Sequence, residues 1–511
     1  MERRLRISWA VALILVLCMV SPAAGGVSAD SSAVIFQRPY GGSGAELAYA
    51  IQEIGDGGYI AAGTTGSNDG DVSGNHGGVD AWVVKTDAGG MLLWQRCLGG
   101  SGDDTAASIR QTDDGGYVLT GYTTSNDGDV SGNHGSDDLW VVKLDADGDL
   151  LWQRCLGGSF RDAGAAIRQT SDGGYVVAGA ALSFDGDVRG NNGLSDVWVV
   201  KLDGSGSLLW QSCLGGSGID AGASIQETAD GGYIVAGGTF SNNGDVSGNH
   251  GGADAWVVKM DGRGRLLWQR CLGGSEDDYA AAVAETADGG YIVTGTTGSS
   301  DGDITGNHGS DDLWVVKLDA DGDLLWQRCL GGSGDDRGWS ICRTTDGGYL
   351  VGGWTASADG DATGSHGGAD LWMVKLNAAG SLLWQRCCGG SGGDYGYGIL
   401  QHTDGGYVGA GSTASRDGDV TGKHASSDLW VVKVAVRQVA ALPGYADPPT
   451  DPDGDGLYED LNGSGRLDFA DVVVYFEQME WIADNEPVDC FDYNGNGRID
   501  FNDIVVLFGG V

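Results

Sequence analysis

Residues 138–156 read DLWVVKLDADGDLLWQRCL, two apolar runs on either side of a turn rich in aspartate and glycine. The run from Leu139 to Leu144 is apolar at positions that would point to both faces of a strand. A sheet with one face in water has no need of this pattern, so both faces of the strand are expected to be covered.

The same pattern recurs seven times, once every 58 residues. In the unit from Thr105 to Gly158, four strands are predicted at 105–112, 117–123, 138–145 and 150–156, with an acidic loop at 124–137. The repeat is marked by one tryptophan and one tyrosine per copy: Trp82, Trp140, Trp198, Trp256, Trp314, Trp372 and Trp430, and Tyr59, Tyr117, Tyr175, Tyr233, Tyr291, Tyr349 and Tyr407.

Four-stranded sheets stacked face to face in a ring cover both faces of every strand and form a β-propeller. An open solenoid is the alternative, and it would need capping repeats. The segment 34–40 matches the fourth strand of the later units, and the array stops on a third strand near Val436. The predicted fold is therefore an all-β, seven-bladed propeller over residues 34–437, closed by the strand 34–40 and followed by a small α-helical domain.

The chain has 511 residues and a net charge of −42, which argues against a nucleic-acid partner. Residues 1–29 have the features of a signal peptide: Arg3, Arg4 and Arg6, an apolar run from Ile7 to Val20, and a small-residue cleavage site ending at Ala29. No later segment is apolar enough to span a membrane. We therefore expect a secreted protein that is extracellular or associated with the cell surface.

The stretch from Val141 to Trp152 resembles the tryptophan motif of quinoprotein-like propellers. The whole unit is similar to the Asp-Gly-Gly-Tyr repeats of secreted prokaryotic propeller proteins. The resemblance implies the architecture and leaves the activity open.

The acidic loop has the spacing of an EF-hand-like calcium loop. Asp127, Asp129 and Ser131 occupy positions 1, 3 and 5, Gly132 occupies position 6, and Asp138 occupies position 12. The alternative is a glycine-rich loop whose polar side chains cap their own backbone.

Three further sets of side chains recur with the repeat. Six loop histidines are expected to be structural: His76, His134, His250, His308, His366 and His424. A ring of acids before each first strand is expected to make one face strongly negative: Glu46, Asp104, Asp162, Asp220, Asp278, Asp336 and Asp394. One first-strand position varies: Gln52, Arg110, Arg168, Gln226, Ala284, Cys342 and Leu400.

After a linker at 438–450, residues 451–511 form a different module with two calcium-type loops 32 residues apart. The expected ligands are Asp460, Asn462, Ser464, Arg466, Asp468 and Asp471, then Asp492, Asn494, Asn496, Arg498, Asp500 and Asp503, the two arginines through their backbone carbonyls. Asp453, Asp455 and Glu459 are candidates for a further site. An apolar helix is expected after each loop.

This module resembles a type I dockerin, which implies one calcium ion per loop and docking to a cohesin-like receptor. Positions 10 and 11 of the loops, Phe469-Ala470 and Phe501-Asn502, depart from the small hydroxyl residues of that family. A calcium-locked module that packs on its own propeller or on another surface protein is the alternative.

These features predict a calcium-binding propeller that acts as a binding or scaffold protein. The expected partners are a cohesin-like or surface-layer protein and a polysaccharide. No catalytic residue stands out, because sevenfold repetition places each candidate acid in similar surroundings. The rival hypothesis is an O-glycosyl hydrolase of endoglucanase type within an extracellular polysaccharide-degrading complex.

Overall fold

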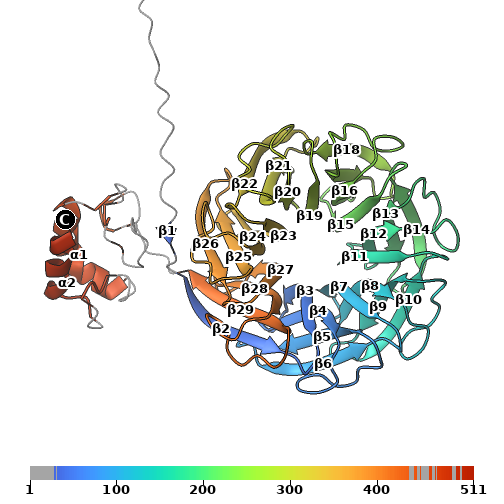
Figure 1. The fold of residues 1–511 in the computed structure, drawn as a ribbon, viewed down its shortest axis with the longest axis horizontal. Helices are drawn as coiled ribbons and strands as arrows, with labels where there is room; N and C mark the ends of the chain where they lie inside the picture. Colours follow the sequence, from blue (N-terminus) through green and yellow to red (C-terminus); the bar gives the residue numbers. More distant parts are fainter. Residues whose placement is uncertain are drawn as a thin grey trace, which may run out of the picture.

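The chain folds into a ring of seven four-stranded sheets in a computed structural model, and a separate helical module follows (Figure 1). The structure describes residues 28–29, 32–436, 442–445, 449, 458, 460–462, 466–467, 469–485, 491–494 and 498–510. Most of the predicted signal peptide and linker, together with Ser464, Asp468, Asn496, Asp453, Asp455 and Glu459, lies outside the described residues.

Each blade is an antiparallel meander whose first strand lies at the centre of the ring and whose fourth lies at the rim (Figure 1). The first strands are β3 (Glu46–Glu53), β7 (Asp104–Gln111), β11 (Asp162–Gln169), β15 (Asp220–Glu227), β19 (Asp278–Glu285), β23 (Asp336–Arg343) and β27 (Asp394–Gln401). The second strands are β4 (Tyr59–Thr65), β8 (Tyr117–Thr123), β12 (Tyr175–Ala181), β16 (Tyr233–Thr239), β20 (Tyr291–Thr297), β24 (Tyr349–Thr355) and β28 (Tyr407–Thr413).

The outer half of each blade is equally regular. The third strands are β5 (Asp80–Thr86), β9 (Asp138–Leu144), β13 (Asp196–Leu202), β17 (Asp254–Met260), β21 (Asp312–Leu318), β25 (Asp370–Leu376) and β29 (Asp428–Val436). The fourth strands are β6 (Leu92–Leu98), β10 (Leu150–Leu156), β14 (Leu208–Leu214), β18 (Leu266–Leu272), β22 (Leu324–Leu330), β26 (Leu382–Cys388) and β2 (Ser32–Tyr40). The predicted seven-bladed all-β propeller is confirmed, and the predicted strand bounds hold to within one residue in the unit 105–158.

The seventh blade takes its fourth strand from the start of the repeat array, because β2 pairs antiparallel with β29 from Ser32 opposite Val436 to Tyr40 opposite Leu429. Trp430 Nε1 donates to Gln37 Oε1 at 2.9 Å, and Gln37 Nε2 donates to the Thr421 carbonyl at 3.1 Å. The same two bonds occur within other blades, for example from Trp140 to Gln153 and from Gln153 to the Ser131 carbonyl. β2 therefore supplies both the missing strand and the missing partner of a buried tryptophan. A further short strand, β1 (Ser28–Ala29), pairs parallel with β26.

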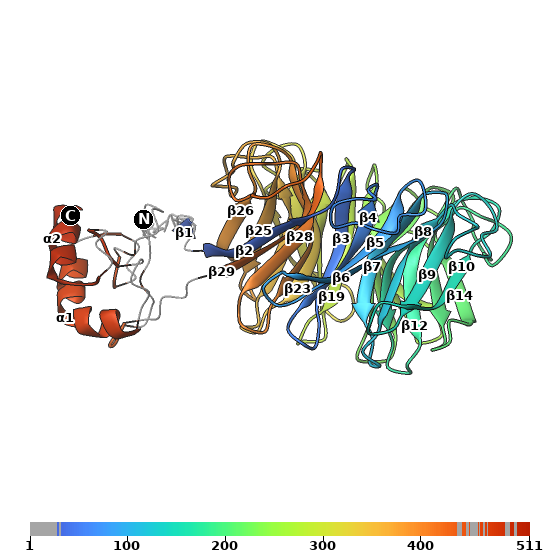
Figure 2. The same cartoon turned by 90° about the horizontal axis from the view of Figure 1, so that it is seen from below.

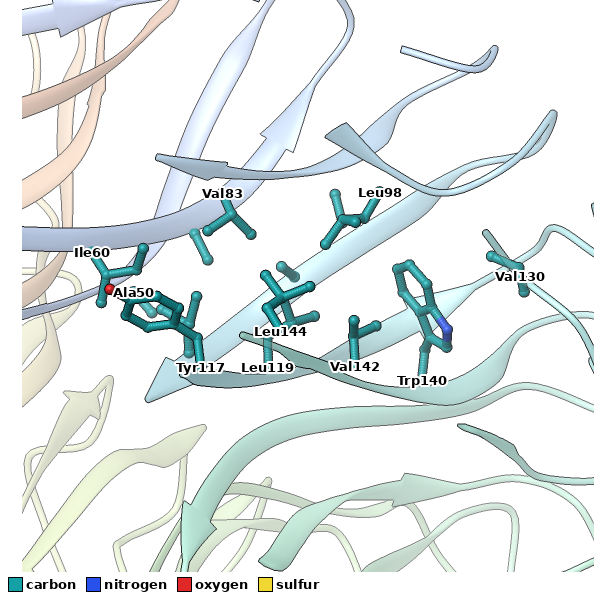
Figure 3. Close-up of a cluster of buried hydrophobic side chains, with 14 of the residues drawn as sticks. Ala50, Ile60, Val83, Leu98, Tyr117, Leu119, Val130, Trp140, Val142 and Leu144 are labelled. Atoms are coloured by element: carbon teal, nitrogen blue, oxygen red, sulfur yellow. The ribbon is translucent and has the colours of Figure 1, made fainter. Parts of the chain in front are cut away.

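Seven apolar clusters hold the ring together, one between each pair of neighbouring blades. Figure 3 shows the cluster in which Val83 of β5 faces Val142 and Trp140 of β9 across the gap between two sheets. Alternate residues of one strand serve two interfaces, since Trp82 and Val84 pack against the seventh blade instead. Burial of each such side chain stabilises the fold by roughly 1.5–3 kcal/mol, so apolar residues on both strand faces are explained.

Glycines at two kinds of position are required by this geometry. Gly115, in the turn between β7 and β8, has φ of 82° in the left-handed region. A Cβ on Gly121 of β8 would lie 1.8 Å from the Thr105 carbonyl oxygen, so only glycine lets β7 approach there. This close approach accompanies a β-bulge between Ala106 and Ser108, and an equivalent bulge occurs in every first strand.

The C-terminal module contains helices α1 (Phe469–Asn485) and α2 (Phe501–Gly510) among its described residues. Tyr475, Ile482, Phe491 and Leu507 are in its small apolar core. The Tyr475 hydroxyl donates to the Phe491 carbonyl at 2.7 Å. Neither described helix combines the length and the hydropathy that crossing a membrane requires. Figure 2 shows the propeller edge-on, with both helices outside the ring.

Candidate functional site

The acid that precedes each first strand is structural, and the prediction that these acids make one face strongly negative is wrong. Glu46, Asp104 and their five equivalents are fully buried. Asp104 accepts hydrogen bonds from the Thr123 hydroxyl, from Ser125 Oγ at 2.7 Å and from the Gly100 amide at 2.8 Å. In every blade at least one hydroxyl group, from the end of the second strand or from the loop that follows, donates to this carboxylate, which therefore faces the blade and not solvent.

The loop histidines are structural, as predicted. His134 donates its backbone amide to Asp138 Oδ2 at 3.0 Å, and its Nδ1 lies 2.6 Å from the same oxygen. The five other loop histidines repeat the contact with Asp80, Asp254, Asp312, Asp370 and Asp428. In the third blade Asn192 replaces the histidine and contributes only its backbone amide to Asp196.

The other residues predicted to bind calcium in the propeller loop accept hydrogen bonds from other parts of the propeller. Asp127 Oδ1 accepts from the Ser101 amide at 2.7 Å, and the Ser131 carbonyl and hydroxyl accept from Gln153 Nε2. Asp129 Oδ2 lies 3.4 Å from the Gly99 amide nitrogen. Over the described parts of the chain, no three His, Cys, Asp or Glu side chains are grouped to hold a metal ion. Calcium in this loop therefore stays a prediction.

One buried oxygen of the loop lacks a donor among the described residues. Asp138 Oδ1 is buried and has no hydrogen-bond partner among the described residues. A Cβ built on Gly157 would lie 2.7 Å from that oxygen and 2.8 Å from Asp162 Oδ2, so this glycine leaves a space bordered by two carboxylates. Burial raises the pKa of Asp138, and the charge of Asp162 adds to the effect. Five further blades have the same orphaned oxygen, on Asp80, Asp196, Asp254, Asp312 and Asp370.

The two C-terminal loops have the same internal hydrogen bonds. The Asn462 amide and Nδ2 donate to Asp471 Oδ1 at 3.1 and 2.6 Å, and Asn494 does the same to Asp503 Oδ1 at 3.0 and 2.5 Å. Positions 3 and 12 of each predicted loop are therefore in contact. Asp460, Asp471 and Asp503 are fully buried.

Electrostatics around the second C-terminal loop favour a cation. Burial raises the pKa of Asp503, and the nearby carboxylates of Asp492 and Asp500 raise it further, although backbone amides of Asp500 and Asn494 oppose the shift. Converging carboxylates and amide oxygens are the donor set that Ca²⁺ takes. The described residues of the second loop supply donors of this kind, and calcium in the two loops stays a prediction.

The two helices of the module expose an apolar face. Phe469, Val473, Phe476, Phe501, Val505 and Phe508 are each at least 40% exposed. The ring centroids of Phe469 and Phe508 are 6.1 Å apart, and those of Phe476 and Phe501 are 6.5 Å apart. Because these positions are related by the 32-residue repeat, the face has an approximate internal twofold symmetry. We call it the two-helix face.

The central channel of the propeller is lined in part by positions whose residue differs between blades. The bulge in each first strand leaves one residue out of the ladder and aims it at the channel. These bulged residues are Tyr49, Ala107, Ala165, Ala223, Ala281, Trp339 and Tyr397. The channel holds a cavity of about 430 Å³.

The three aromatic bulged residues come from adjacent blades and contact one another. Tyr49 and Tyr397 have ring centroids 5.6 Å apart, and those of Trp339 and Tyr397 are 5.5 Å apart. The other four blades contribute alanine at this level. One wall of the channel is therefore aromatic and the opposite wall is open.

A second level of the channel is formed by the variable first-strand position noted in the sequence. Gln52, Arg110, Arg168, Cys342 and Leu400 line the cavity there. Burial inside the channel lowers the pKa of Arg110 to about 10. Burial lowers the pKa of Arg168 well below its ordinary value, and the charge of Arg110 lowers it further.

A second cavity of about 500 Å³ lies at the end of the channel that carries the long loops, and shares Trp339 with the first. We call it the mouth cavity. Phe240, Tyr279 and Trp339 line it and are 47%, 40% and 41% exposed. Residues with small side chains or none form its floor: Ala221, Gly222, Ala223, Gly237 and Gly238.

Charged groups stand at one side of the mouth cavity. Arg337 Nη2 donates to Asp311 Oδ2 at 2.7 Å, and its guanidinium lies 5.4 Å from the ring centroid of Trp354. Asp277 lines the same cavity. Burial raises the pKa of Asp311, although Arg337 opposes this shift.

The sequence indicated the variable position of the channel but not the aromatic residues of the channel and mouth. A signal for them exists: at the bulged position four copies have alanine, and the other three have Tyr49, Trp339 and Tyr397. Departures from an otherwise regular repeat therefore mark this site, once the bulge is known to point inward.

Comparison with known proteins adds little to the observed fold. No family model matches the chain. The regulatory protein FlaEY of Caulobacter vibrioides is 27% identical over 227 residues, which cover 41% of this chain and only 22% of that protein's length. Its regulatory role is therefore a statement about that protein.

Matching solved structures are distant in sequence and have TM-scores below 0.5. The WD40 domain of Neurospora crassa Pan2 is 10% identical with a TM-score of 0.45, covering 80% of this chain and 98% of that domain. BamB of Moraxella catarrhalis is 14% identical with a TM-score of 0.37, covering 79% and 99%. A puromycin hydrolase is 16% identical with a TM-score of 0.41, covering 73% of this chain and 50% of the enzyme.

Proposed function

We propose that the protein is a secreted or cell-surface binding protein whose ligand enters the propeller through the mouth cavity. The observation that carries the proposal is the place of the non-repeating aromatic residues, which gather at the mouth and channel. Shallow clefts that combine exposed aromatic rings with a few polar groups are typical of ligand sites. A sugar polymer is the ligand class that we favour, because aromatic rings pack against the C–H faces of sugars while hydroxyl groups reach the polar rim.

A glycan-array screen of the full chain tests this proposal, followed by calorimetry on the oligosaccharide that is retained. We expect Trp339→Ala and Tyr279→Ala to weaken binding by roughly tenfold each, the cost of losing one aromatic contact. Phe184→Ala is the matched control, since Phe184 is 61% exposed and does not line the mouth cavity. Equal loss in all three variants, or no loss in any, would contradict the proposal.

We propose further that the C-terminal module is a dockerin-like calcium module that tethers the propeller to a cohesin-like or surface-layer protein through the two-helix face. Support comes from the repeated Asn-to-Asp bonds and buried carboxylates of its loops, and from the exposed phenylalanines. Calcium would hold Asp460, Asn462 and Asp471 in the first loop and Asp492, Asn494, Asp500 and Asp503 in the second. Ser464, Asp468, Asn496 and the carbonyls of Arg466 and Arg498 would complete the two sets.

Removal of calcium from the full chain tests the tether. We expect chelation to make residues 450–511 sensitive to protease while the propeller stays intact, because clustered carboxylates repel one another without the ion. Re-addition of Ca²⁺ should restore resistance, and Asp503→Asn should reduce it at limiting calcium. Unchanged protease resistance of the module in chelator would refute the calcium assignment.

The signal peptide fits the same proposal. Cleavage after Ala29 would remove β1 and leave β23 to β26 as an ordinary four-stranded blade. Calcium in the propeller loops is proposed on narrower grounds, because only Asp138 among Asp127, Asp129, Ser131 and Asp138 has a buried oxygen without a donor among the described residues. The space beside Gly157, bordered by Asp138 and Asp162, is where such an ion would fit.

A polysaccharide hydrolase is the second candidate, and one observation favours it. Asp311 and Asp277 line the mouth cavity together, and burial raises the pKa of Asp311, as general-acid catalysis requires. Release of reducing ends by the full chain, lost in Asp311→Asn and in Asp277→Asn but not in Asp137→Asn, would establish the hydrolase. Binding without turnover would establish the binding protein.

A further inference from the structure

The channel contains two neighbouring arginines without a carboxylate partner. Arg110 Nη1 donates to the Ile109 carbonyl at 2.8 Å, and Arg168 Nη1 donates to the Ile167 carbonyl at 2.9 Å. Neither guanidinium forms an ion pair with any described residue. By contrast Arg96, Arg270 and Arg337, which lie outside the narrow part of the channel, each contact an aspartate.

Arg154 and Arg328 of the outer strands also form no ion pair with a described residue. Arg110 and Arg168 differ from them because burial inside the channel lowers the pKa of both, in a chain with 71 acidic side chains and 29 basic ones. Two guanidinium groups on adjacent first strands repel each other, and the channel deprives both of part of their hydration. Such a pair is costly unless an anion neutralises it. Guanidinium groups in this arrangement offer the paired N–H donors that bind a carboxylate or another oxyanion.

A neutral donor flanks the pair on the neighbouring blade. Gln52 Oε1 accepts from the Gln111 amide at 2.8 Å, so the side chain is fixed, while its Nε2 has no partner among the described residues. Gln52, Arg110 and Arg168 therefore form an arc of hydrogen-bond donors at one level of the cavity. Cys342 and Leu400 make the opposite side of that level apolar.

The donor arc and the aromatic trio belong to one cavity. Arg110 lies three residues along β7 from the bulge level, a separation of about 10 Å along a strand. A single sugar ring is too short to contact both, whereas two linked rings reach from one to the other. The strongly negative net charge of the protein disfavours a polyanion, so a ligand with one charge is expected.

We propose that the channel binds a disaccharide with one acidic sugar, its carboxylate between Arg110 and Arg168 and its neutral ring against Tyr49, Trp339 and Tyr397. This inference rests on the proposed binding function and adds the ligand class. Gln52 donates to the same carboxylate or to a neighbouring hydroxyl group.

Calorimetry on the full chain tests the proposal with two matched ligands, cellobiouronic acid and its neutral counterpart cellobiose. We expect the acid to bind at least tenfold more tightly. Arg110→Gln/Arg168→Gln should abolish that preference, and the substitution is compatible with the fold because Gln52 and Gln226 occupy the equivalent positions. Arg154→Gln/Arg328→Gln removes the same charge from outer strands, where both arginines bond to their own backbone, and should leave the preference unchanged.

Two further outcomes separate this proposal from the binding function on which it rests. Equal affinity for both disaccharides, with loss of both in Trp339→Ala, would overturn the acidic ligand and keep the binding site. Acetate or sulfate alone binding as tightly as the acidic disaccharide would overturn the role of the aromatic trio. No measurable binding of the acid, with a folded protein, would overturn the proposal.

Discussion

The outer strands of the propeller and the wall of its channel are made by the same repeat. The residues of the outer strands are nearly the same in all seven copies, whereas those of the channel wall differ. Trp140 of β9 has six equivalents, all buried tryptophans between two sheets. Trp339 of the channel has four alanine equivalents and is 41% exposed. Packing between two sheets requires a large apolar side chain at the position of Trp140. No packing within the blade requires a particular side chain at the position of Trp339. The difference indicates that packing constrains the buried position, and it leaves the channel position free to serve the binding function that we propose.

The largest effect should come from breaking the ring itself. Deletion of residues 32–40 exposes the edge of β29 and leaves Trp430 without its partner Gln37. We expect aggregation or loss of the folded state, because an open sheet edge and the apolar faces beside it reach water. Size-exclusion chromatography and thermal unfolding measure this. A monomer with an unchanged melting temperature would show that closure does not depend on β2.

The next test places the two kinds of tryptophan side by side. Trp140→Ala should lower the free energy of unfolding by about 3–5 kcal/mol, since it empties a buried site and removes the Nε1 donor of Gln153 Oε1. Trp339→Ala should lower it by less than about 1 kcal/mol, because the ring is partly exposed and alanine occurs in four equivalent blades. Denaturant unfolding of both variants measures the two losses in unfolding free energy. Similar losses would mean that the channel wall is as structural as the blades.

The sequence predicted the blades well and the site poorly, for one physical reason. A run that is apolar on both strand faces, repeated every 58 residues, specifies sheets with two covered faces. The match of 34–40 to the fourth strands predicted that this segment completes the last blade. The buried acids at Asp104 and its equivalents were misjudged because their donors lie about 20 residues further along the chain, Thr123 at the end of β8 and Ser125 in the loop after it. The inward direction of Trp339 depends on a bulge that sequence does not reveal.

Removal of one channel charge should stabilise the protein. Arg168→Gln relieves a guanidinium that is poorly hydrated and repelled by Arg110. We expect a gain of about 0.5–2 kcal/mol, within the range found when a functional site is relaxed. Thermal unfolding at low and high salt measures it, with Arg154→Gln as the outer-strand control. A loss of stability in Arg168→Gln alone would mean that the arginine supports the fold instead.

The smallest expected effect concerns the one blade without its histidine. Burial raises the pKa of Asp196 to about 6, and Asp220 adds to the shift. A carboxyl with a raised folded-state pKa takes up protons more readily when folded, so stability falls as pH rises from about 4 to above 6. Asn192→His should remove roughly 1 kcal/mol of this fall between pH 5 and pH 7. A pH series of melting temperatures for both proteins measures it, and parallel curves would contradict the prediction.

Pairing of β2 with β29 also constrains the order of folding. The two strands are separated by about 400 residues, so their pairing has a large entropic cost of loop closure. We therefore expect this pairing to form late in folding. Six blades have all their strands close together in the chain, whereas the seventh stays incomplete until β29 has been synthesised. Until then β2 is an unpaired apolar strand that needs protection from other chains. In the folded protein, we expect unfolding to start where β2 separates from β29. The rate of that separation would then set the lifetime of the folded ring.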